Sequence, residues 1–201
     1  MTTVQEAAAQ ARPTVYDINP INVNRWSPRS FQEKEIPEET LFAVLEAAGY
    51  APSAFNFQPW RFIVARTPEE RARFLPFLNE FNRGWCAKVP VLILIVSQTS
   101  SENGPFPSAA FDAGAAWGAL AHEAVRKGLA THAMTGFDFE LARQTLNVPD
   151  DFAIQAAVAL GYQGDKDALP EAMAAREVPS PRRPLEQTAF KGVFGQPINN
   201  R

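Results

Sequence analysis

Two arginine clusters contain the side chains of this chain that are best suited to hold an anion. Arg25 and Arg29 open and close the segment Arg25-Trp26-Ser27-Pro28-Arg29, while Arg182 and Arg183 are neighbours near the C-terminus. A guanidinium group is a planar fork of N–H donors that can pair with two phosphate oxygens at once. A single arginine is more often a solvated surface residue. The two clusters are therefore candidates, as a set, for binding one phosphate group.

A second candidate is the loop Ala51-Pro52-Ser53-Ala54-Phe55-Asn56-Phe57-Gln58-Pro59-Trp60. It follows a segment with helical periodicity and leads directly into a strand-like run, and binding groups concentrate on loops that rigid elements hold. The amides of Asn56 and Gln58 offer donors and acceptors together, which suits the edge of a planar heteroaromatic ring. Alternatively, the loop is only a stiff turn whose amides satisfy backbone groups.

The elements that must position these groups alternate only loosely between helix and strand, which predicts an α+β fold. Leu41, Val44, Leu45 and Ala48 fall on one face of a helix that begins near Glu38 and ends near Gly49. The apolar run 91–96 is rich in β-branched residues, as in a strand buried on both faces. We also expect strands at 61–65 and 152–160 and helices at 68–83, 108–128 and 138–146, the last two capped by Ser108 and Asp138.

The two ends of the chain have weaker patterns than its middle. Residues 1–20 form an expected N-terminal arm, with a helix from Thr3 to Gln10. Residues 163–201 are charged and proline-rich, so this segment would be held poorly on its own. The expected helix 108–128 is rich in Ala and Gly, which suits a dimer seam, although an alanine-rich core helix would have the same pattern.

Composition bounds the function of the chain. Its 201 residues, 46% hydrophobic and 20% charged, suit one domain with a substantial core. A net charge of −3 argues against nucleic-acid binding, and the apolar run 89–96 is too short to span a membrane. Cys86 is the single cysteine, which favours a reducing cytoplasm. The first residues have neither a basic region nor a continuous apolar run, so we do not expect a signal peptide here. The sequence has no glycine-rich nucleotide motif and no metal-ligand spacing around Cys86, His122 and His132.

The order and spacing of four motifs resemble the FMN-dependent nitroreductase family. The first is Arg-x-Ser-x-Arg-x-Phe, from Arg25 to Phe31, and the second is Pro-Ser-x-x-Asn-x-Gln-Pro-Trp, from Pro52 to Trp60. The others are Thr135-Gly136-Phe137-Asp138 and Arg182-Arg183-Pro184-Leu185-Glu186. The resemblance covers roughly residues 22 to 190, and the set of motifs is specific for the family but not for a substrate.

The resemblance implies roles for twelve cofactor-binding residues. Arg25 and Arg182 would bind the FMN phosphate with Ser27 and Trp26, and Arg29 would lie near the pyrimidine side of the flavin ring. Arg183 would be a second phosphate contact or only a surface residue. The remaining six would contact the flavin ring, partly across a subunit seam: Pro52, Ser53, Asn56, Gln58, Thr135 and Gly136.

The resemblance also implies a fold and a reaction. The fold would have three layers around a mainly antiparallel sheet, in a homodimer whose C-terminal arms, residues 163–201, wrap the partner. NADH or NADPH would pass a hydride to flavin N5 and leave, and a small-molecule acceptor such as a nitroaromatic or a quinone would follow. No side-chain acid or base is required, so no catalytic residue is expected.

Three departures from the family pattern leave alternatives open. Trp26 stands where a second basic residue is frequent, Ser180 stands near the position of a lysine, and Phe57 is unusually bulky. Relatives of this fold reduce enals or semialdehydes, remove halogen or break down flavin, and this chain could do the same. Loops 98–107 and 163–178 would decide between these reactions. The chain could also be a flavin-binding module without catalysis. His132 is close enough in sequence to the third motif to approach the flavin.

Overall fold

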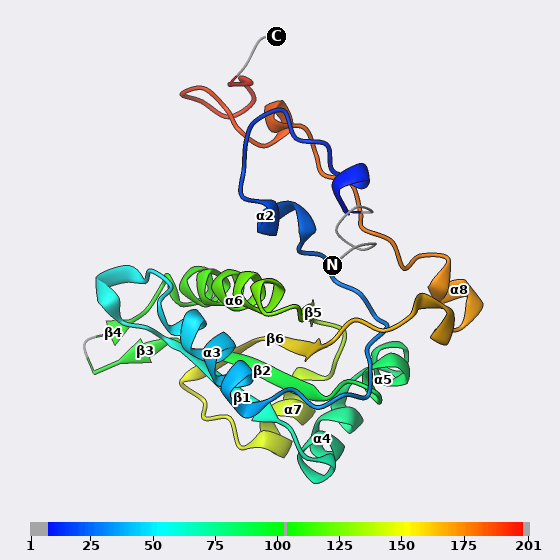
Figure 1. The fold of residues 1–201 in the computed structure, drawn as a ribbon. Helices are drawn as coiled ribbons and strands as arrows, with labels where there is room; N and C mark the ends of the chain where they lie inside the picture. Colours follow the sequence, from blue (N-terminus) through cyan, green and yellow to red (C-terminus); the bar gives the residue numbers. More distant parts are fainter. Residues whose placement is uncertain (1–7, 103, 199–201) are drawn as a thin grey trace.

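The computed structural model describes residues 8–102 and 104–198, which form a layered body with two terminal arms (Figure 1). A four-stranded sheet lies at the centre in the order β1-β2-β6-β5, and all its neighbours are antiparallel. Its strands are β1 (Trp60–Ala65), β2 (Val91–Gln98), β5 (Ala130–Met134) and β6 (Phe152–Gly161). Helices α3 (Glu38–Gly49) and α6 (Ala109–Arg126) cover one face, and α4 (Pro68–Phe74), α5 (Glu80–Cys86) and α7 (Phe139–Leu146) cover the other. The α+β prediction is confirmed.

Strand β2 shows why the sheet has a helical layer on each face. Leu92, Leu94 and Val96 pack into the cluster under α4, α5 and α7, whereas Val91, Ile93 and Ile95 pack into the cluster under α3 and α6. Successive side chains of a strand point to opposite faces, so an uninterrupted apolar run requires cover on both sides. Burying each of these side chains contributes about 1.5–3 kcal/mol, and the prediction of a doubly buried strand is confirmed.

The predicted single helix at 68–83 is wrong, because the chain breaks into α4, the 3-10 turn η2 (Leu75–Phe77) and α5. Pro76 lacks the N–H that a continuous helix would need. Asn79 then starts α5 as its cap, since its side chain accepts a 2.8 Å hydrogen bond from the Asn82 N–H. The break also turns Phe81 away from the core side of Phe74 and Phe77, and it is 51% exposed.

The remaining elements agree with the sequence more closely. The helix at 38–49, the strands at 61–65 and 152–160 and the cap of α7 by Asp138 are confirmed. Helix α6 follows Ser108 as predicted, but the Ser108 hydroxyl donates to the Asp112 carboxylate rather than capping the backbone. Strand β5 was not predicted. Loop 98–107 contains a small hairpin of β3 (Ser100–Ser101) and β4 (Gly104–Pro105).

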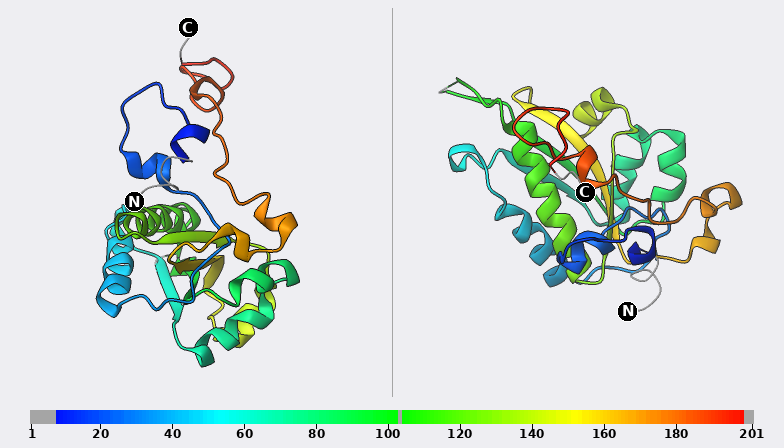
Figure 2. Two further views of the ribbon diagram at one scale, coloured as in Figure 1. Left: turned by 45° about the vertical axis from the view of Figure 1, so that its right-hand side comes forward. Right: turned by 90° about the horizontal axis from the view of Figure 1, so that it is seen from above.

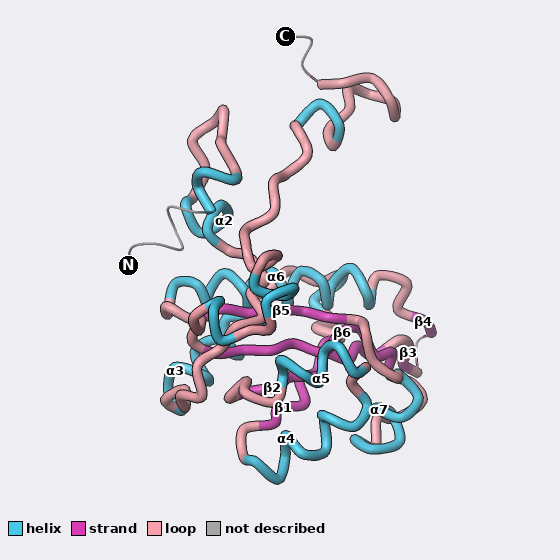
Figure 3. The backbone as a smooth tube through the Cα atoms, turned by 90° about the vertical axis from the view of Figure 1, so that its right-hand side faces the viewer, coloured by secondary structure: helices cyan, strands magenta, loops and turns pink. Residues whose placement is uncertain are grey.

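Both terminal arms leave the body on the same side and consist mostly of loop (Figures 2 and 3). The N-terminal arm carries a turn of helix at residues 8–11 and α2 (Pro20–Asn24), while the predicted helix 3–10 lies largely outside the described residues. The C-terminal arm carries η3 (Lys166–Ala168), α8 (Glu171–Ala174) and η4 (Leu185–Gln187). In the described ranges, no helix combines the length and the apolar character needed to cross a membrane.

Candidate functional site

An arginine-rich pocket of about 200 Å³ lies where the two arms meet strand β5. Five arginines line it and, among the described residues, no carboxylate does: Arg12, Arg25, Arg29, Arg176 and Arg182. The other lining residues are Trp26, Ser27, His132, Val178 and Ser180. The structure thus brings the first and last predicted motifs together, although they are more than 150 residues apart in the chain.

The charges of this pocket repel one another. Burial lowers the pKa of Arg25, and nearby Arg182 lowers it further. The pKa of Arg12 falls to about 10, chiefly through burial and then through Arg182 and Arg25. Guanidinium groups held together in a partly desolvated site strengthen each other's field. An anion that entered the pocket would relieve this repulsion.

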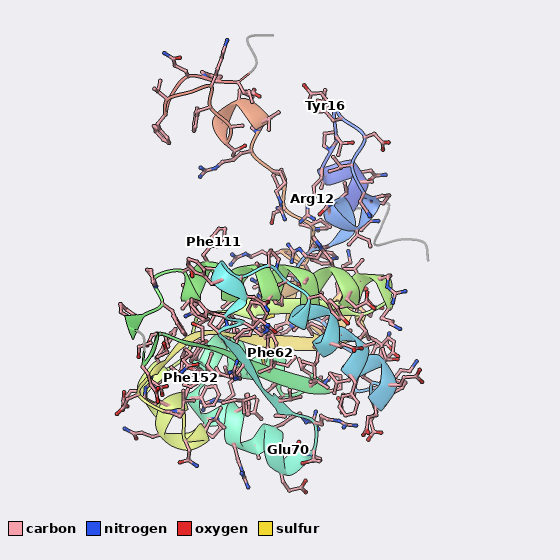
Figure 4. The ribbon with its side chains drawn as sticks, turned by 90° about the vertical axis from the view of Figure 1, so that its left-hand side faces the viewer. Arg12, Tyr16, Phe62, Glu70, Phe111 and Phe152 are labelled. Carbon is pink, nitrogen blue, oxygen red and sulfur yellow. The ribbon has the colours of Figure 1, made fainter. Side chains whose placement is uncertain are left out.

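Arg12 fastens the N-terminal arm to the rest of the site. Its side chain is buried, and its Nη1 donates to the carbonyl oxygens of Val23 and Arg25, both at 2.7 Å. Its Nε donates to the carbonyl oxygen of Ser180 at 2.9 Å. Figure 4 shows Arg12 on the arm beside the C-terminal segment. Arg12 was not predicted as a site residue.

Glu177 fastens the C-terminal segment to the first motif. Its carboxylate is buried and accepts hydrogen bonds from the backbone N–H groups of Arg29, at 2.5 Å, and Ser30, at 2.8 Å. The Arg29 guanidinium lies 3.9 Å from the second carboxylate oxygen and 5.7 Å from the centre of the Phe81 ring. Glu177 therefore balances part of the Arg29 charge, whereas no carboxylate in the described part of the chain pairs with Arg12, Arg25 or Arg182.

His132 adds a neutral ring to the pocket rather than a further cation. Burial is the main cause that lowers its pKa, and the charges of Arg29 and Arg25 act in the same direction. Its Nδ1 lies 2.8 Å from the carbonyl oxygen of Pro28, which can only accept, so Nδ1–H is the donor. The ring centre lies 4.8 Å from that of Trp85. These contacts hold β5 against the first motif.

These residues fit a phosphate group. Four of the five pocket arginines have no carboxylate partner in the described structure: Arg12, Arg25, Arg176 and Arg182. The Arg25 guanidinium also lies 3.3 Å from the Ser27 hydroxyl. The buried Trp26 Nε1 and Arg29 Nε have no acceptor among the described residues. Buried donors are normally paired. Glu177 Oε2, which lies 3.9 Å from Arg29 Nη1, is a buried acceptor that also lacks a hydrogen-bond partner, so it is Trp26 Nε1 that indicates a missing acceptor. A phosphate dianion supplies both the charge and the acceptors.

A larger cleft of about 470 Å³ is a weaker candidate. Two of its charged lining side chains, Glu70 and Arg71, serve local structure. Glu70 forms a reciprocal helix cap with Thr67, and Arg71 donates to the carbonyl oxygen of Val89 at 2.7 Å. No group of three metal-ligating side chains occurs in the part of the chain that the structure describes.

The Thr135-Gly136 turn follows β5 but does not line the pocket. The Gly136 carbonyl accepts from the Asn79 N–H at 3.1 Å and from Asn82 Nδ2 at 3.0 Å. A Cβ at Gly136 would lie only 2.6 Å from the Nδ2 atoms of both asparagines. Glycine therefore lets these two side chains keep their hydrogen bonds at the start of α5, a reason that the motif alone did not reveal.

The Pro52–Gln58 loop lies at the other end of the sheet from the pocket (Figure 1). Across the sheet, His132 on β5 pairs with Ala159 on β6, which in turn pairs with Leu92 on β2. Trp60, the strand residue that follows the loop, pairs with Ser97 on β2. Leu92 and Ser97 are five residues apart on β2, which is about 17 Å along the strand. This chain alone therefore does not bring the amide loop to the arginines.

Within one chain the loop satisfies its own polar groups. Gln58 Nε2 donates to Asn56 Oδ1 at 3.0 Å, and the Gln58 N–H donates to the Ser53 hydroxyl at 3.0 Å. Phe55, Asn56 and Gln58 have positive φ angles of 50°, 59° and 48°. Such backbone is unfavourable for residues with a Cβ, and it concentrates at binding sites. In the same loop the Phe55 side chain is 92% exposed.

The predicted residues thus fall into three groups. Arg25, Trp26, Ser27, Arg29 and Arg182 line the pocket. Thr135 and Gly136 lie at the end of β5, three to four residues beyond the pocket residue His132. Arg183 is exposed and outside the pocket, and Pro52, Ser53, Asn56 and Gln58 are remote from it in this chain.

Comparisons with known proteins bear on the family and the fold of the chain. The model of the Nitroreductase family matches residues 23–84 and 77–162. A solved structure described as an oxidoreductase containing FMN has a TM-score of 0.89 and 39% identity, and the match covers 98% of this chain and 100% of that one. An uncharacterized 15.4 kDa protein of Mycolicibacterium smegmatis is 37% identical over 69% of this chain and 99% of its own length. An NADH dehydrogenase of Thermus thermophilus is 28% identical over 90% of this chain and 98% of its own length.

Proposed function

The chain belongs to the nitroreductase family, and on that premise we propose that its arginine pocket holds the phosphate of FMN and that the protein passes electrons from NADH or NADPH to a small-molecule acceptor. The chain is an FMN oxidoreductase by its family and by its likeness to an FMN-containing oxidoreductase. The observation that carries the proposed site is the pocket itself, where five arginines face one another without a lining carboxylate in the described structure.

Each pocket residue has a proposed task in holding the cofactor. Arg25 and Arg182 would pair with phosphate oxygens, and Ser27, beside the Arg25 guanidinium, would donate its hydroxyl. Bound FMN would supply the chemistry of accepting and donating a hydride. Arg29 would place positive charge near the pyrimidine part of the ring, and Glu177 would limit that charge. His132 stays neutral and would help to position Pro28 and the first motif.

We propose that the complete site is shared between two copies of the chain. The amide loop and the pocket lie at opposite ends of one sheet, so the loop of one subunit would serve the pocket of its partner. The C-terminal arm would wrap that partner, since its end carries Phe194 at 91% exposure and has little core of its own. Thr135 and Gly136 would present backbone N–H groups to the ring.

Mixing two inactive variants tests the shared site. Arg25→Ala breaks the pocket and Gln58→Ala breaks the loop. After unfolding and refolding the two variants together, a mixed dimer would contain one site with a normal pocket and a normal loop. Activity should then recover toward about one quarter of the wild-type value, by the statistics of random pairing in a symmetric dimer. No recovery, although mixed dimers are detected, would place both parts of the site in one chain.

The acceptor is tested by a panel of compounds. Nitroaromatics and quinones are the proposed class, and enals, semialdehydes, halogenated phenols and free flavin represent the competing chemistries. The protein, supplied with FMN, is assayed for oxidation of NADH and of NADPH with each acceptor, and kcat/KM values are compared. The highest value with a nitroaromatic or a quinone supports the proposal. If the protein binds FMN but consumes no NADH or NADPH with any acceptor, it is a flavin-binding module and not an oxidoreductase of these acceptors.

A further inference from the structure

We propose that Arg12, on the N-terminal arm, is a further binding residue of the phosphate site and donates its free guanidinium nitrogen to the bound anion. This inference rests on the proposed function, in which the anion is the phosphate of FMN. It extends that function to a residue that precedes the range matched by the family model, which begins at residue 23.

The hydrogen bonds of Arg12 orient its guanidinium group. Nε is bound to the Ser180 carbonyl oxygen, and Nη1 is shared between the carbonyl oxygens of Val23 and Arg25. Nη2 has no hydrogen-bond partner in the described structure, although Arg12 lines the pocket. A guanidinium carries five N–H donors in one plane, so a group anchored at two nitrogens presents the third in a fixed direction.

The charge of Arg12 also requires a partner. The residue is 6% exposed, and an arginine is almost never so buried without an anionic partner. The charges that act on it are those of the cations Arg182 and Arg25, both of which lower its pKa. The described residues provide only neutral carbonyl oxygens. A phosphate in the pocket would neutralise Arg12, Arg25 and Arg182 together.

A purely structural role is the competing explanation. The same three hydrogen bonds tie the arm to the start of the first motif and to the C-terminal segment. A structural tie would affect every ligand of the site alike. A phosphate contact would affect FMN but not riboflavin, which has the same ring and no phosphate.

The experiment compares FMN with riboflavin on the flavin-free full-length protein. Dissociation constants are measured by flavin fluorescence for wild type, Arg12→Ala and Arg12→Lys, with Arg73→Ala as the control. Arg73 is exposed on α4 and outside the pocket. Arg12→Ala should weaken FMN binding by about 10- to 100-fold and leave riboflavin binding within about twofold. Arg12→Lys, which keeps the charge but not the fork, should fall between wild type and Arg12→Ala.

Two results would overturn the role of Arg12. One is FMN affinity unchanged in Arg12→Ala. The other is an equal loss of FMN and riboflavin affinity, which would make Arg12 only a structural tie. If Arg12→Ala does not fold, judged by circular dichroism, the ratio of FMN to riboflavin affinity in Arg12→Lys decides the question.

A second probe separates this inference from the proposed function. Inorganic phosphate, without flavin, should raise the unfolding temperature of the wild-type protein more than that of Arg12→Ala. If wild type binds no flavin but shows this difference, the FMN proposal fails and the anion site remains. If wild type binds FMN and Arg12→Ala shows neither change, the function remains and the assignment of Arg12 fails.

Discussion

The backbone N–H of Arg29 donates a 2.5 Å hydrogen bond to the carboxylate of Glu177, a residue 148 positions later in the chain. The same carboxylate oxygen accepts from the Ser30 N–H. One buried acid therefore holds the C-terminal segment against the first arginine motif and so places Arg182 near Arg25. Neither segment is helix or strand at this point, so the pocket depends on this side-chain contact.

Replacing Glu177 should destabilise the protein. Glu177→Ala leaves the buried Ser30 N–H and the partly buried Arg29 N–H without an acceptor. It should lower the free energy of unfolding by about 1–3 kcal/mol. Glu177→Gln keeps one acceptor oxygen and should cost less. Urea unfolding measures both, with the exposed Glu171→Ala as the control. Equal stability of Glu177→Ala and Glu171→Ala would show that the contact contributes nothing.

Removing either proposed phosphate ligand should weaken FMN binding. Arg25→Ala and Arg182→Ala each delete a charged hydrogen-bonding group and should cost about 1.5–3 kcal/mol, or about 10- to 150-fold in affinity. Arg25 is the more buried of the two, so its loss should be the larger. Fluorescence titration with FMN measures the change, and Arg73→Ala should bind normally. Wild-type affinity in both variants would refute the phosphate assignment.

A methyl group at Gly136 should disturb the turn after β5. Gly136→Ala places a Cβ 2.6 Å from the Nδ2 atoms of Asn79 and Asn82, so these two side chains must shift. The shift disturbs the Asn79 cap of α5 and the hydrogen bond from Asn82 Nδ2 to the Gly136 carbonyl oxygen. Overpacking of this kind costs about 1–3 kcal/mol. Gly84→Ala is the matched control, because nothing lies within 4 Å of its added Cβ. Thermal unfolding compares the two variants. A Gly136→Ala protein as stable as Gly84→Ala would contradict the packing argument.

The neutral His132 should make stability depend on pH. Because its pKa is lowered in the folded protein, the unfolded chain binds the proton more tightly. Its contribution is therefore fully present above the ordinary pKa of about 6.5 and declines as the pH falls below that value. Urea unfolding at about pH 7.5 and about pH 5 should show a smaller loss on acidification for His132→Gln than for wild type. An identical loss in both proteins would mean that His132 does not titrate in this range.

The sequence predicted the elements whose burial follows a simple period. Leu41, Val44 and Ala48 mark one face of α3, and the run 91–96 marks a strand covered on both sides, as observed. Strand β5 was not predicted because its short sequence Ala-Thr-His-Ala-Met has neither a long apolar run nor a clear alternation of apolar and polar residues. Its pairing with β6 comes from tertiary context, which overrides weak local preference.

The site could be predicted only where a motif marked it. Arg25, Arg29 and Arg182 were identified because family motifs contain them, whereas Arg12 and Glu177 stand in segments without periodicity. A lone Arg and a lone Glu in polar segments look like solvated surface residues. Only the path of the two arms shows that both are buried at one point. The amide loop was placed correctly between a helix and a strand, but its distance from the arginines is a property of the sheet register.

The most direct test is the absorbance spectrum of the purified full-length protein with FMN, before and after NADH or NADPH is added without oxygen. A bound-flavin spectrum that bleaches with either nicotinamide is the predicted result, because the pocket would hold FMN where it can accept a hydride. A protein that stays colourless after FMN is added and removed by gel filtration would contradict the assignment of the arginine pocket to the FMN phosphate.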